Sequence, residues 1–256
     1  MGILNVTPDS FADGGRYDTT EKAMARARQM LHEGVDIIDV GGESTRPGAE
    51  RISESAELER VIPVITELAK LNAVISIDTS RAFVAERAIS AGSRIINDVS
   101  GGLADPEMLG TAAKLSVPYI AMHSRGESKT MQERATYKDV VGEVIDELKA
   151  RLKAAEAAGI SRNNLVIDPG LGFAKESSHN WQILNRLTEF TELGLPLLIG
   201  ASRKRFLGEI TSTTSPDDRE AASVALTALL AAQRVWGVRV HSVKAHRDAI
   251  AVAGEF

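Results

Sequence analysis

The 256-residue sequence contains no cysteine, which excludes disulfides, cysteine-ligated zinc, iron–sulfur clusters and thiol nucleophiles. Aromatic residues make up only 4% of the chain, too few for a platform that stacks on single-stranded nucleic acid. Positive charge is also short, because 30 Lys and Arg stand against 35 Asp and Glu, for a net charge of −5. Binding to nucleic acid or to a membrane surface needs a basic face, so we expect neither kind of partner.

Long hydrophobic runs are missing as well. No apolar stretch reaches the ~18 residues that a membrane-spanning helix requires. The segment Met1–Thr7 has neither the basic start nor the small-residue cleavage site of a secretion signal. We therefore expect a cytoplasmic protein, and the chain is long enough to bury a large core.

What the sequence does contain is a set of eight short apolar runs, each rich in aliphatic or β-branched residues. They lie at Ile3–Val6, Asp36–Val40, Val74–Asp78, Arg94–Val99, Tyr119–Met122, Leu165–Asp168, Leu197–Ile199 and Val238–His241. Nearly continuous hydrophobicity over so few residues is typical of strands that are buried on both faces of a parallel sheet.

Between these runs, apolar residues recur at helical spacing. The pattern predicts helices over Thr20–Leu31, Leu58–Ala69, Ala82–Ala91, Pro106–Leu115 and Lys138–Ala158, and one more that begins after Ser215. Asp18 and Glu21 form a capping-box pattern before the first helix, and Pro63 should kink the second.

Eight strand-then-helix units in about 250 residues are typical of a single-domain (β/α)8 TIM barrel, here spanning residues 1–256. The main rival is an open, doubly wound sheet. That fold often carries a glycine-rich dinucleotide loop, and the sequence has no G-x-G-x-x-G after a strand and no G-x4-G-K-[ST]. The sequence therefore favours an α/β barrel.

In such a barrel, catalytic groups lie where the strands end and the following loops begin. These positions are unusually polar here, and they include Asn5, Asp39, Asp78, Asn97, His123, Asp168, Lys204, Arg239 and His241. A strand end needs no such groups for stability, and burying one of them unpaired costs roughly 2–7 kcal/mol. We expect these side chains to converge in one mouth.

One subset of these residues is suited to a flat heterocycle. Asp78 and Asp168 can each accept hydrogen bonds from two adjacent N–H groups, Asn97 can both donate and accept, and Lys204 donates. This combination matches a ring with an amidine-like edge.

A second subset is suited to an anion. Arg46 and Arg239 can clamp phosphate oxygens, with His241 beside them, and the side-chain carbonyl of Asn5 can hold Mg²⁺ while phosphate and water complete the shell. Together the two subsets predict a heterocycle that carries a phosphate or diphosphate, with Mg²⁺ as cofactor.

Each residue also has a purely structural interpretation. Asp78 and Asn97 could equally cap the helices that follow them. Asp39 and Asp98 each have a neighbour better placed to face the barrel axis, so we expect both to be structural. Arg203 could form an ordinary surface ion pair. The set is therefore more specific than any single member.

Two long motifs resemble a known family. Gly2–Phe11, followed by Asp13–Gly15, resembles the first signature of the dihydropteroate synthases, and Asp39–Gly48 resembles the second. Further matches follow in the family's order at Ile77–Thr79, Ile96–Val99, Met122–His123, Asp168–Gly170 with Gly172–Phe173, Ser202–Lys204 and Val238–His241. The resemblance covers essentially the whole chain.

The resemblance implies a transferase of folate biosynthesis that joins 6-hydroxymethyl-7,8-dihydropterin diphosphate to p-aminobenzoate in an SN1-like reaction. It implies that the pterin is bound by Asp78, Asn97, Met122, Asp168 and Lys204. It implies that the diphosphate is bound by Arg46, Arg239 and His241, with Asn5 as the Mg²⁺ ligand. It implies a p-aminobenzoate pocket, where sulfonamides compete, bordered by Phe11, Thr45, Pro47, Phe173, Ser202 and Lys204. The catalytic roles would fall to Asp78, Asp168, Lys204, Arg239 and His241.

Three other functions remain open at this point. A barrel of this kind could bind pterin without turnover, and a pterin-dependent methyltransferase would share the pterin subset but would not need Arg239 and His241. A Schiff-base aldolase could use Lys204 instead. The family is usually dimeric through its last helices, so the resemblance also implies a homodimer.

Overall fold

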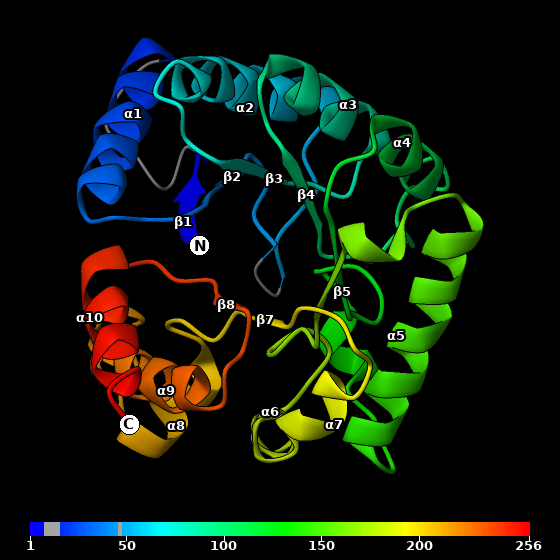
Figure 1. The fold of residues 1–256 in the computed structure, drawn as a ribbon, viewed down its shortest axis with the longest axis vertical. Helices are drawn as coiled ribbons and strands as arrows, with labels where there is room; N and C mark the ends of the chain where they lie inside the picture. Colours follow the sequence, from blue (N-terminus) through cyan, green and yellow to red (C-terminus); the bar gives the residue numbers. More distant parts are fainter. Residues whose placement is uncertain (8–15, 46–47) are drawn as a thin grey trace.

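Eight parallel strands form the centre of the computed structural model, which describes residues 1–7, 16–45 and 48–256 (Figure 1). The strands within these described residues are β1 (Gly2–Asn5), β2 (Ile38–Gly41), β3 (Ile75–Asp78), β4 (Ile95–Asp98), β5 (Tyr119–Met122), β6 (Leu165–Asp168), β7 (Leu198–Ile199) and β8 (Gly237–Val238). Strands β1 to β6 pair in sequence order, and β7 pairs with β8. Bridges from Ile167 to Leu197 and from Gly2 to Val240 join these two sheets at both edges, so the predicted closed barrel is confirmed.

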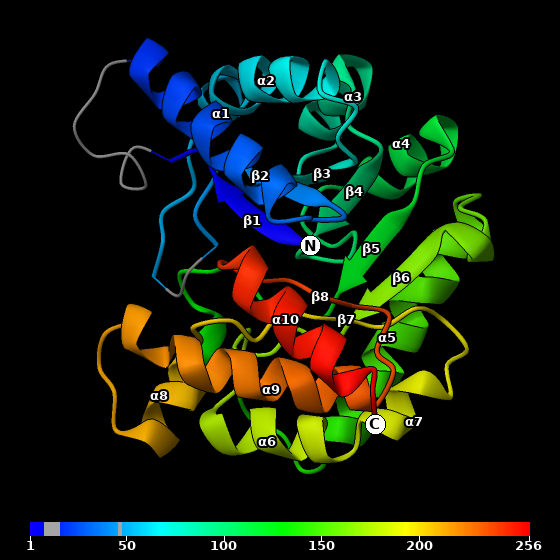
Figure 2. The same cartoon turned by 60° about the vertical axis from the view of Figure 1, so that its left-hand side comes forward.

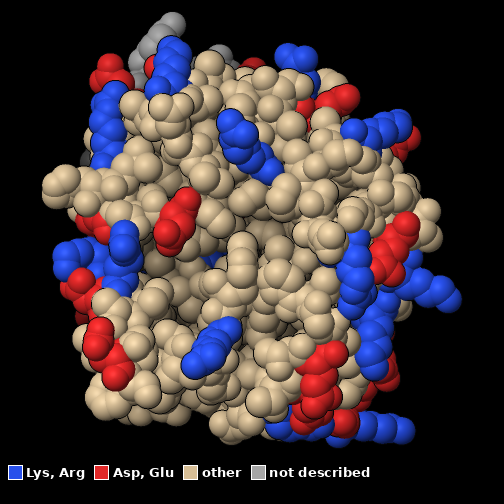
Figure 3. Space-filling view, in the orientation of Figure 1, with Lys and Arg blue, Asp and Glu red and all other residues tan. Residues whose placement is uncertain are grey.

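The helices surround the strands (Figures 1 and 2). They are α1 (Arg16–His32), α2 (Glu54–Ala69), α3 (Ala82–Ala91), α4 (Met108–Leu115), α5 (Val140–Ala157), α6 (Ser177–Asn185), α7 (Leu187–Thr191), α8 (Arg205–Thr211), α9 (Glu220–Ala232) and α10 (Val243–Ala253). No helix in the described part of the chain combines the length and apolarity needed to cross a bilayer. On the face drawn in Figure 3, basic and acidic side chains are interspersed.

Most of the predicted elements are confirmed, with shifts of up to four residues at their ends, the largest at the starts of α1 and α2. Helix α3 has the predicted bounds, and α2 continues through Pro63. The predicted cap at Asp18 is wrong, because α1 begins at Arg16 and Asp18 lies within its first turn. The helices α6, α7, α8 and α10 were not predicted, since three of them are short and α6 opens with the weak helix formers Ser177 and Ser178.

Two apolar clusters fill the molecule, one outside the strands and one inside them. Outward-facing strand residues such as Val40, Ile77 and Ile167 pack against the helices in the large cluster. The smaller cluster lies within the barrel and consists of Ile95, Ile120, Val166 and Leu198, with Met1 and Ile37 packed against it.

The inner cluster decides which polar residues face the barrel axis. Successive strand residues point to opposite faces, so the residues two positions further along each strand point inward again, one layer higher. These residues are Asp39, Asn97, Met122, Asp168 and Gly200. The barrel therefore has an apolar floor and a mainly polar layer above it, at the ends where the strands lead into their loops.

The loop after β6 packs closely against the backbone at the end of β5, and Gly170 is the point of closest approach. Gly170 has a positive φ of 67°, and a Cβ added there would lie 1.9 Å from the backbone oxygen of His123. We expect Gly170→Ala to lower the free energy of unfolding by about 3 kcal/mol or more, because left-handed strain adds to a clash with backbone.

Gly194 provides the matched control. It has the same φ of 67°, but a Cβ there would meet nothing within 4 Å. Gly194→Ala should therefore cost only about 1 kcal/mol of strain. Urea unfolding of both variants measures the difference, and equal losses would contradict a steric clamp at Gly170.

Candidate active site at the barrel mouth

Arg239, which follows β8, crosses the barrel interior to two carboxylates. Its Nε donates to Asp39 Oδ2 at 2.6 Å, and its Nη2 donates to Asp78 Oδ2 at 2.7 Å. The side-chain amide of Asn97 donates to the same oxygen of Asp39 at 3.0 Å. The ends of β2, β3, β4 and β8 are thus joined by one hydrogen-bonded group, which we call the arginine cluster: Asp39, Asp78, Asn97 and Arg239.

The two aspartates that we expected to be structural differ in orientation. Asp98 faces outward and accepts from the Tyr119 hydroxyl at 2.7 Å and from backbone N–H groups of its own loop, so that prediction is confirmed. For Asp39 the expected orientation is wrong, because its side chain is fully buried inside the barrel, while its structural role stays a prediction. Its neighbour in the layer above is Gly41, which has no side chain, so Asp39 provides the inward-facing group of β2.

Asp168 and Lys204 form a second group around Gly200, just beyond β7. A Cβ added to Gly200 would lie 3.7 Å from Asp168 Oδ2, 3.9 Å from Lys204 Nζ and 3.9 Å from Arg239 Cβ. The absence of a side chain at Gly200 therefore lets these three residues approach one another. Lys204 Nζ also donates to the Leu171 carbonyl.

Two further predicted residues meet at the rim. The Ser202 hydroxyl lies 3.0 Å from His241 Nδ1, and it accepts from the His241 backbone N–H at 3.2 Å. The Ser202 hydroxyl thus contacts both the ring and the backbone of His241 at the rim.

Burial shifts the charges of this site. Burial, reinforced by the neighbouring Asp39, raises the pKa of Asp78 to about 7 even though Arg239 opposes the shift. Burial likewise raises the pKa of Asp168 and lowers the pKa of Lys204 to about 8. Among the described side chains, Oδ1 of both Asp39 and Asp78 is buried without a hydrogen-bond partner. The site thus offers buried acceptors to a ligand that carries N–H groups.

A cavity of about 250 Å³ opens beside the arginine cluster. Its lining includes Thr45, Asp78, Ser128, Met131 and Phe173, which come from the end of β3 and from the loops after β2, β5 and β6. Thr45 and Phe173 therefore line the same cavity as Asp78 of the arginine cluster, where a ligand could bind. Of the other predicted residues, Met122 is buried on β5, while Phe11, Arg46 and Pro47 lie outside the described residues.

Asn5 is the candidate metal ligand. Its Oδ1 would be 3.7 Å from a Cβ added to Gly41, and Asp78 Oδ2 would be 3.6 Å from the same point. The described residues contain no group of three or more His, Asp or Glu that could hold a metal ion. Mg²⁺ usually keeps several waters and takes one or two protein oxygens together with substrate phosphate, so Asn5 fits this cation.

A family model and known proteins match this chain over nearly its whole length. The model of the family "Pterin binding enzyme" matches residues 1–241. Dihydropteroate synthase of Mycobacterium leprae is 49% identical over 260 residues, covering 99% of this chain and 92% of that protein.

Solved structures are similar over the whole chain. Dihydropteroate synthase of Xanthomonas albilineans with 4-aminobenzoic acid superposes with a TM-score of 0.93 at 46% identity, covering 100% of this chain and 91% of that one. The same enzyme in complex with 7,8-dihydropteroate gives a TM-score of 0.89 at 44% identity, covering 100% and 92%.

The arginine cluster should be as important for folding as for binding. Replacing Arg239 by Met leaves two buried carboxylates without their cation, so the free energy of unfolding should fall by about 3–5 kcal/mol at pH 7. Burial raises the pKa of Asp78 and Arg239 opposes that shift, so without Arg239 the folded state holds a proton on Asp78 more strongly and the loss should shrink as the pH falls to 5.

Urea unfolding at the two pH values measures this dependence. Arg51→Met is the control, because Arg51 is 40% exposed and lies 3.6 Å from Glu43 in an ordinary rim ion pair, whose removal should cost at most about 1 kcal/mol. A loss at Arg239→Met that is the same at both pH values would show that the cluster is not an ion pair in the folded protein.

Proposed function

Because the chain belongs to the pterin-binding enzymes and, within them, to the dihydropteroate synthases, which are transferases, we propose that it condenses 6-hydroxymethyl-7,8-dihydropterin diphosphate with p-aminobenzoate. The products are 7,8-dihydropteroate and diphosphate. The observation that carries the proposal is the pair of buried, unpartnered carboxylate oxygens in the arginine cluster, because a pterin presents adjacent N–H donors that match such acceptors.

In this proposal the pterin is bound deep in the barrel. Asp78, Asn97 and Asp168 hold its N–H groups and ring acceptors, and Met122 packs against it. Lys204 has its ammonium 4.9 Å from the centre of the Phe173 ring, so it borders both the pterin and the p-aminobenzoate. Thr45 and Ser202 border the second substrate, together with Phe11 and Pro47.

The diphosphate is held at the rim. Arg239 and His241 donate to its oxygens together with Arg46, and Asn5 would hold Mg²⁺. When bound, Mg²⁺ supplies positive charge that stabilises the departing anion. Arg239 already neutralises part of the charge of Asp39 and Asp78, so it links the binding of the ring to the binding of the leaving group.

The reaction needs no protein nucleophile. The bond between the pterin methylene carbon and the diphosphate oxygen breaks with its electron pair leaving on oxygen, and the methylene cation is stabilised by the nearby carboxylates of Asp78 and Asp168. In a buried, low-dielectric site these carboxylates act more strongly than they would in water. The amine of p-aminobenzoate then forms the new carbon–nitrogen bond and loses a proton.

We also propose a cytoplasmic homodimer built on α9 and α10, which pack side by side (Figure 2). These helices and their ends expose large apolar side chains at Leu229, Trp236, Ile250 and Val252. Apolar side chains gathered on neighbouring helices commonly mark a protein–protein interface.

Diphosphate release tests the proposed reaction. With both substrates and Mg²⁺ the protein should release diphosphate and form 7,8-dihydropteroate in equal amounts. Chelation with EDTA should stop turnover and added Mg²⁺ should restore it. Without p-aminobenzoate, slow diphosphate release should persist, because water captures an SN1 cation. Binding of the dihydropterin diphosphate with no release under any of these conditions would indicate a non-catalytic pterin-binding barrel instead.

The dimer is tested with a charge on its expected interface. Leu229→Glu places a carboxylate on α9 and should convert the dimer to a monomer in light scattering after size-exclusion chromatography, because the charge would be desolvated in the interface. Leu103→Glu is the control, since Leu103 is similarly exposed but lies in the loop after β4. A monomeric wild-type protein at micromolar concentration would contradict the dimer.

A further inference from the structure

We propose that Lys175, a buried residue that the proposed chemistry does not use, is a positioning residue for this reaction. This inference rests on the proposed function. Through three hydrogen bonds, the side chain of Lys175 fixes the loop between β6 and α6, residues 169–176, which we call loop 6. Loop 6 in turn sets the positions of the groups around both substrates.

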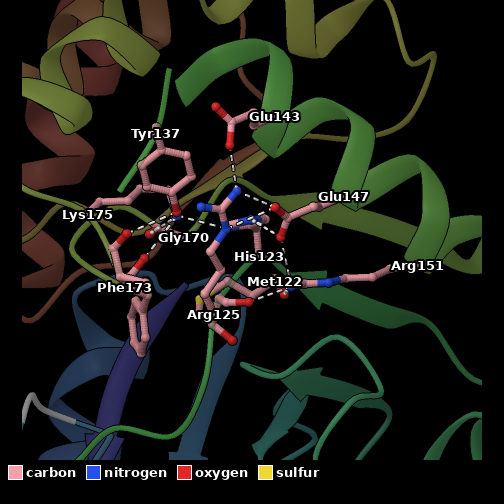
Figure 4. Close-up of polar contacts among 12 residues, drawn as sticks. Met122, His123, Arg125, Tyr137, Glu143, Glu147, Arg151, Gly170, Phe173 and Lys175 are labelled. Atoms are coloured by element: carbon pink, nitrogen blue, oxygen red, sulfur yellow. Dashed lines mark hydrogen bonds and ion pairs between the residues drawn. The ribbon is translucent and has the colours of Figure 1, made fainter. Parts of the chain in front are cut away.

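The surroundings of Lys175 Nζ match an ammonium group. It donates to His123 Nδ1 at 2.8 Å, to the Gly170 carbonyl at 3.1 Å and to the Phe173 carbonyl at 3.0 Å (Figure 4). An ammonium has three N–H groups, one for each acceptor, whereas the neutral amine has only two. The geometry therefore requires the charged form to hold all three partners together.

Keeping this charge is costly. Lys175 is only 3% exposed, and burial lowers its pKa well below the ordinary value, with Arg151 and Lys204 adding to the effect against Asp168 and Glu147. An apolar side chain of similar length would fill the same space without that cost. A buried ammonium at this position therefore indicates a requirement other than packing.

His123 passes the interaction on to helix α5. The pKa of Glu147 is lowered to about 2 by its hydrogen bonds with His123 and Arg125, so its carboxylate accepts from His123 Nε2 at 3.0 Å and the ring hydrogen is on Nε2. Nδ1 of the neutral ring then has a lone pair, which accepts from Lys175. Burial and the neighbouring Lys175 lower the pKa of His123 to about 3, which keeps the ring neutral. Glu147 provides the negative charge at the end of this series of hydrogen bonds, opposite Lys175.

Glu147 is itself held from two sides. Arg125 Nε donates to Glu147 Oε1 at 2.9 Å, and the Arg125 guanidinium lies 3.9 Å from the centre of the Tyr137 ring. Arg151 donates to the Met122 carbonyl at 2.7 Å, so the end of β5 is tied to the same helix (Figure 4). The series of hydrogen bonds from Glu147 through His123 to Lys175 is thus attached to α5 and to the end of β5.

Loop 6 touches the site at three points. The Gly170 N–H donates to Asp168 Oδ1 at 2.7 Å, which orients that carboxylate. The Leu171 carbonyl accepts from Lys204. The Phe173 side chain lines the cavity. Releasing the Gly170 and Phe173 carbonyls would therefore disturb both substrate subsites.

The first test is Lys175→Met, with Lys149→Met on the exposed side of α5 as the control. Misplacing reacting groups by about 1 Å can cost about 100-fold, so we expect kcat/KM of Lys175→Met to fall by about tenfold to 100-fold. Most of the loss should be a higher KM for p-aminobenzoate, because the Phe173 carbonyl is released. The melting temperature should change little, because the desolvation cost that Met removes offsets the three hydrogen bonds that are lost, and Lys149→Met should behave like the wild type.

The second test separates charge from shape, and the lack of cysteine in the chain makes it possible. Lys175→Cys has a single thiol, which can be alkylated in denaturant with bromoethylamine or with 1-bromopropane before refolding. The two products have side chains of the same length, one with an ammonium and one without. The aminoethyl product should recover the wild-type KM for p-aminobenzoate to within about threefold, and the propyl product should resemble Lys175→Met.

A pH profile completes the test. Activity should decline as rising pH removes the proton from residue 175, and the sulfur of the aminoethyl product lowers the pKa of its ammonium, so this decline should move to lower pH. Lys204, with a pKa of about 8, also titrates in this range, but it is present in both proteins, so a shift of the decline between the wild type and the aminoethyl product reports residue 175.

The outcomes are distinct. An active wild type with unchanged kinetics in Lys175→Met, or equal activity of the two alkylated proteins, would overturn the positioning role alone. A wild type without activity would refute the proposed function and this role with it.

Discussion

The alternation of strand side chains inside a closed barrel is the constraint on which the rest of this structure depends. Each strand can place only every second residue inside, and closure brings all eight strands around one axis. The lower inward positions are apolar. The inward positions two residues further along each strand are mainly polar, and they form a layer at the mouth. Residues as far apart in sequence as Asp39 and Arg239 therefore meet at 2.6 Å.

The charges in that layer do not balance. Asp39, Asp78 and Asp168 face Arg239 and Lys204 at the mouth of the barrel, so with every one of these five groups ionised they hold one more negative charge than positive. Burial raises the pKa of Asp78 to about 7, and the neighbouring carboxylate of Asp39 adds to that shift while Arg239 opposes it. In the proposed reaction the same excess favours a cationic methylene group over its neutral precursor, so the cost in the free protein is matched to the chemistry.

The sequence was sufficient to predict the barrel, because each buried strand is a run of apolar residues and this signal is local. It was also sufficient to find Asp78, Asn97, Asp168 and Arg239, since polar residues at the ends of such runs are rare. It failed for Asp39, where the side-chain direction depends on the register of β2 against its neighbours. It suggested a ligand as the partner of Arg239, whereas the partners in the structure are two carboxylates.

Lys175 shows a different limit of sequence reasoning. Its contact with His123 joins residues 52 positions apart, and no periodicity or motif spacing predicts such a contact. A lysine two residues after Phe173, in a loop rich in glycine, would have been assigned to the surface. Only the three acceptors around its ammonium distinguish it from a solvated side chain.

The turn that carries Ser202 and Lys204 shows how the outer helices contribute to the mouth. Arg203, between them, has a positive φ of 60°, a strained conformation for a residue with a side chain. Its backbone N–H donates to Ser223 on α9 at 2.9 Å, and its guanidinium donates to Glu220 at 2.6 Å. Glu220 also contacts His246 of α10 at 3.2 Å.

The expected surface ion pair of Arg203 is therefore present, but it does more than neutralise charge. It lets two packed helices hold a strained turn that directs Ser202 toward His241 and Lys204 toward Asp168. The helices on which we place the dimer interface thus also fix one wall of the site.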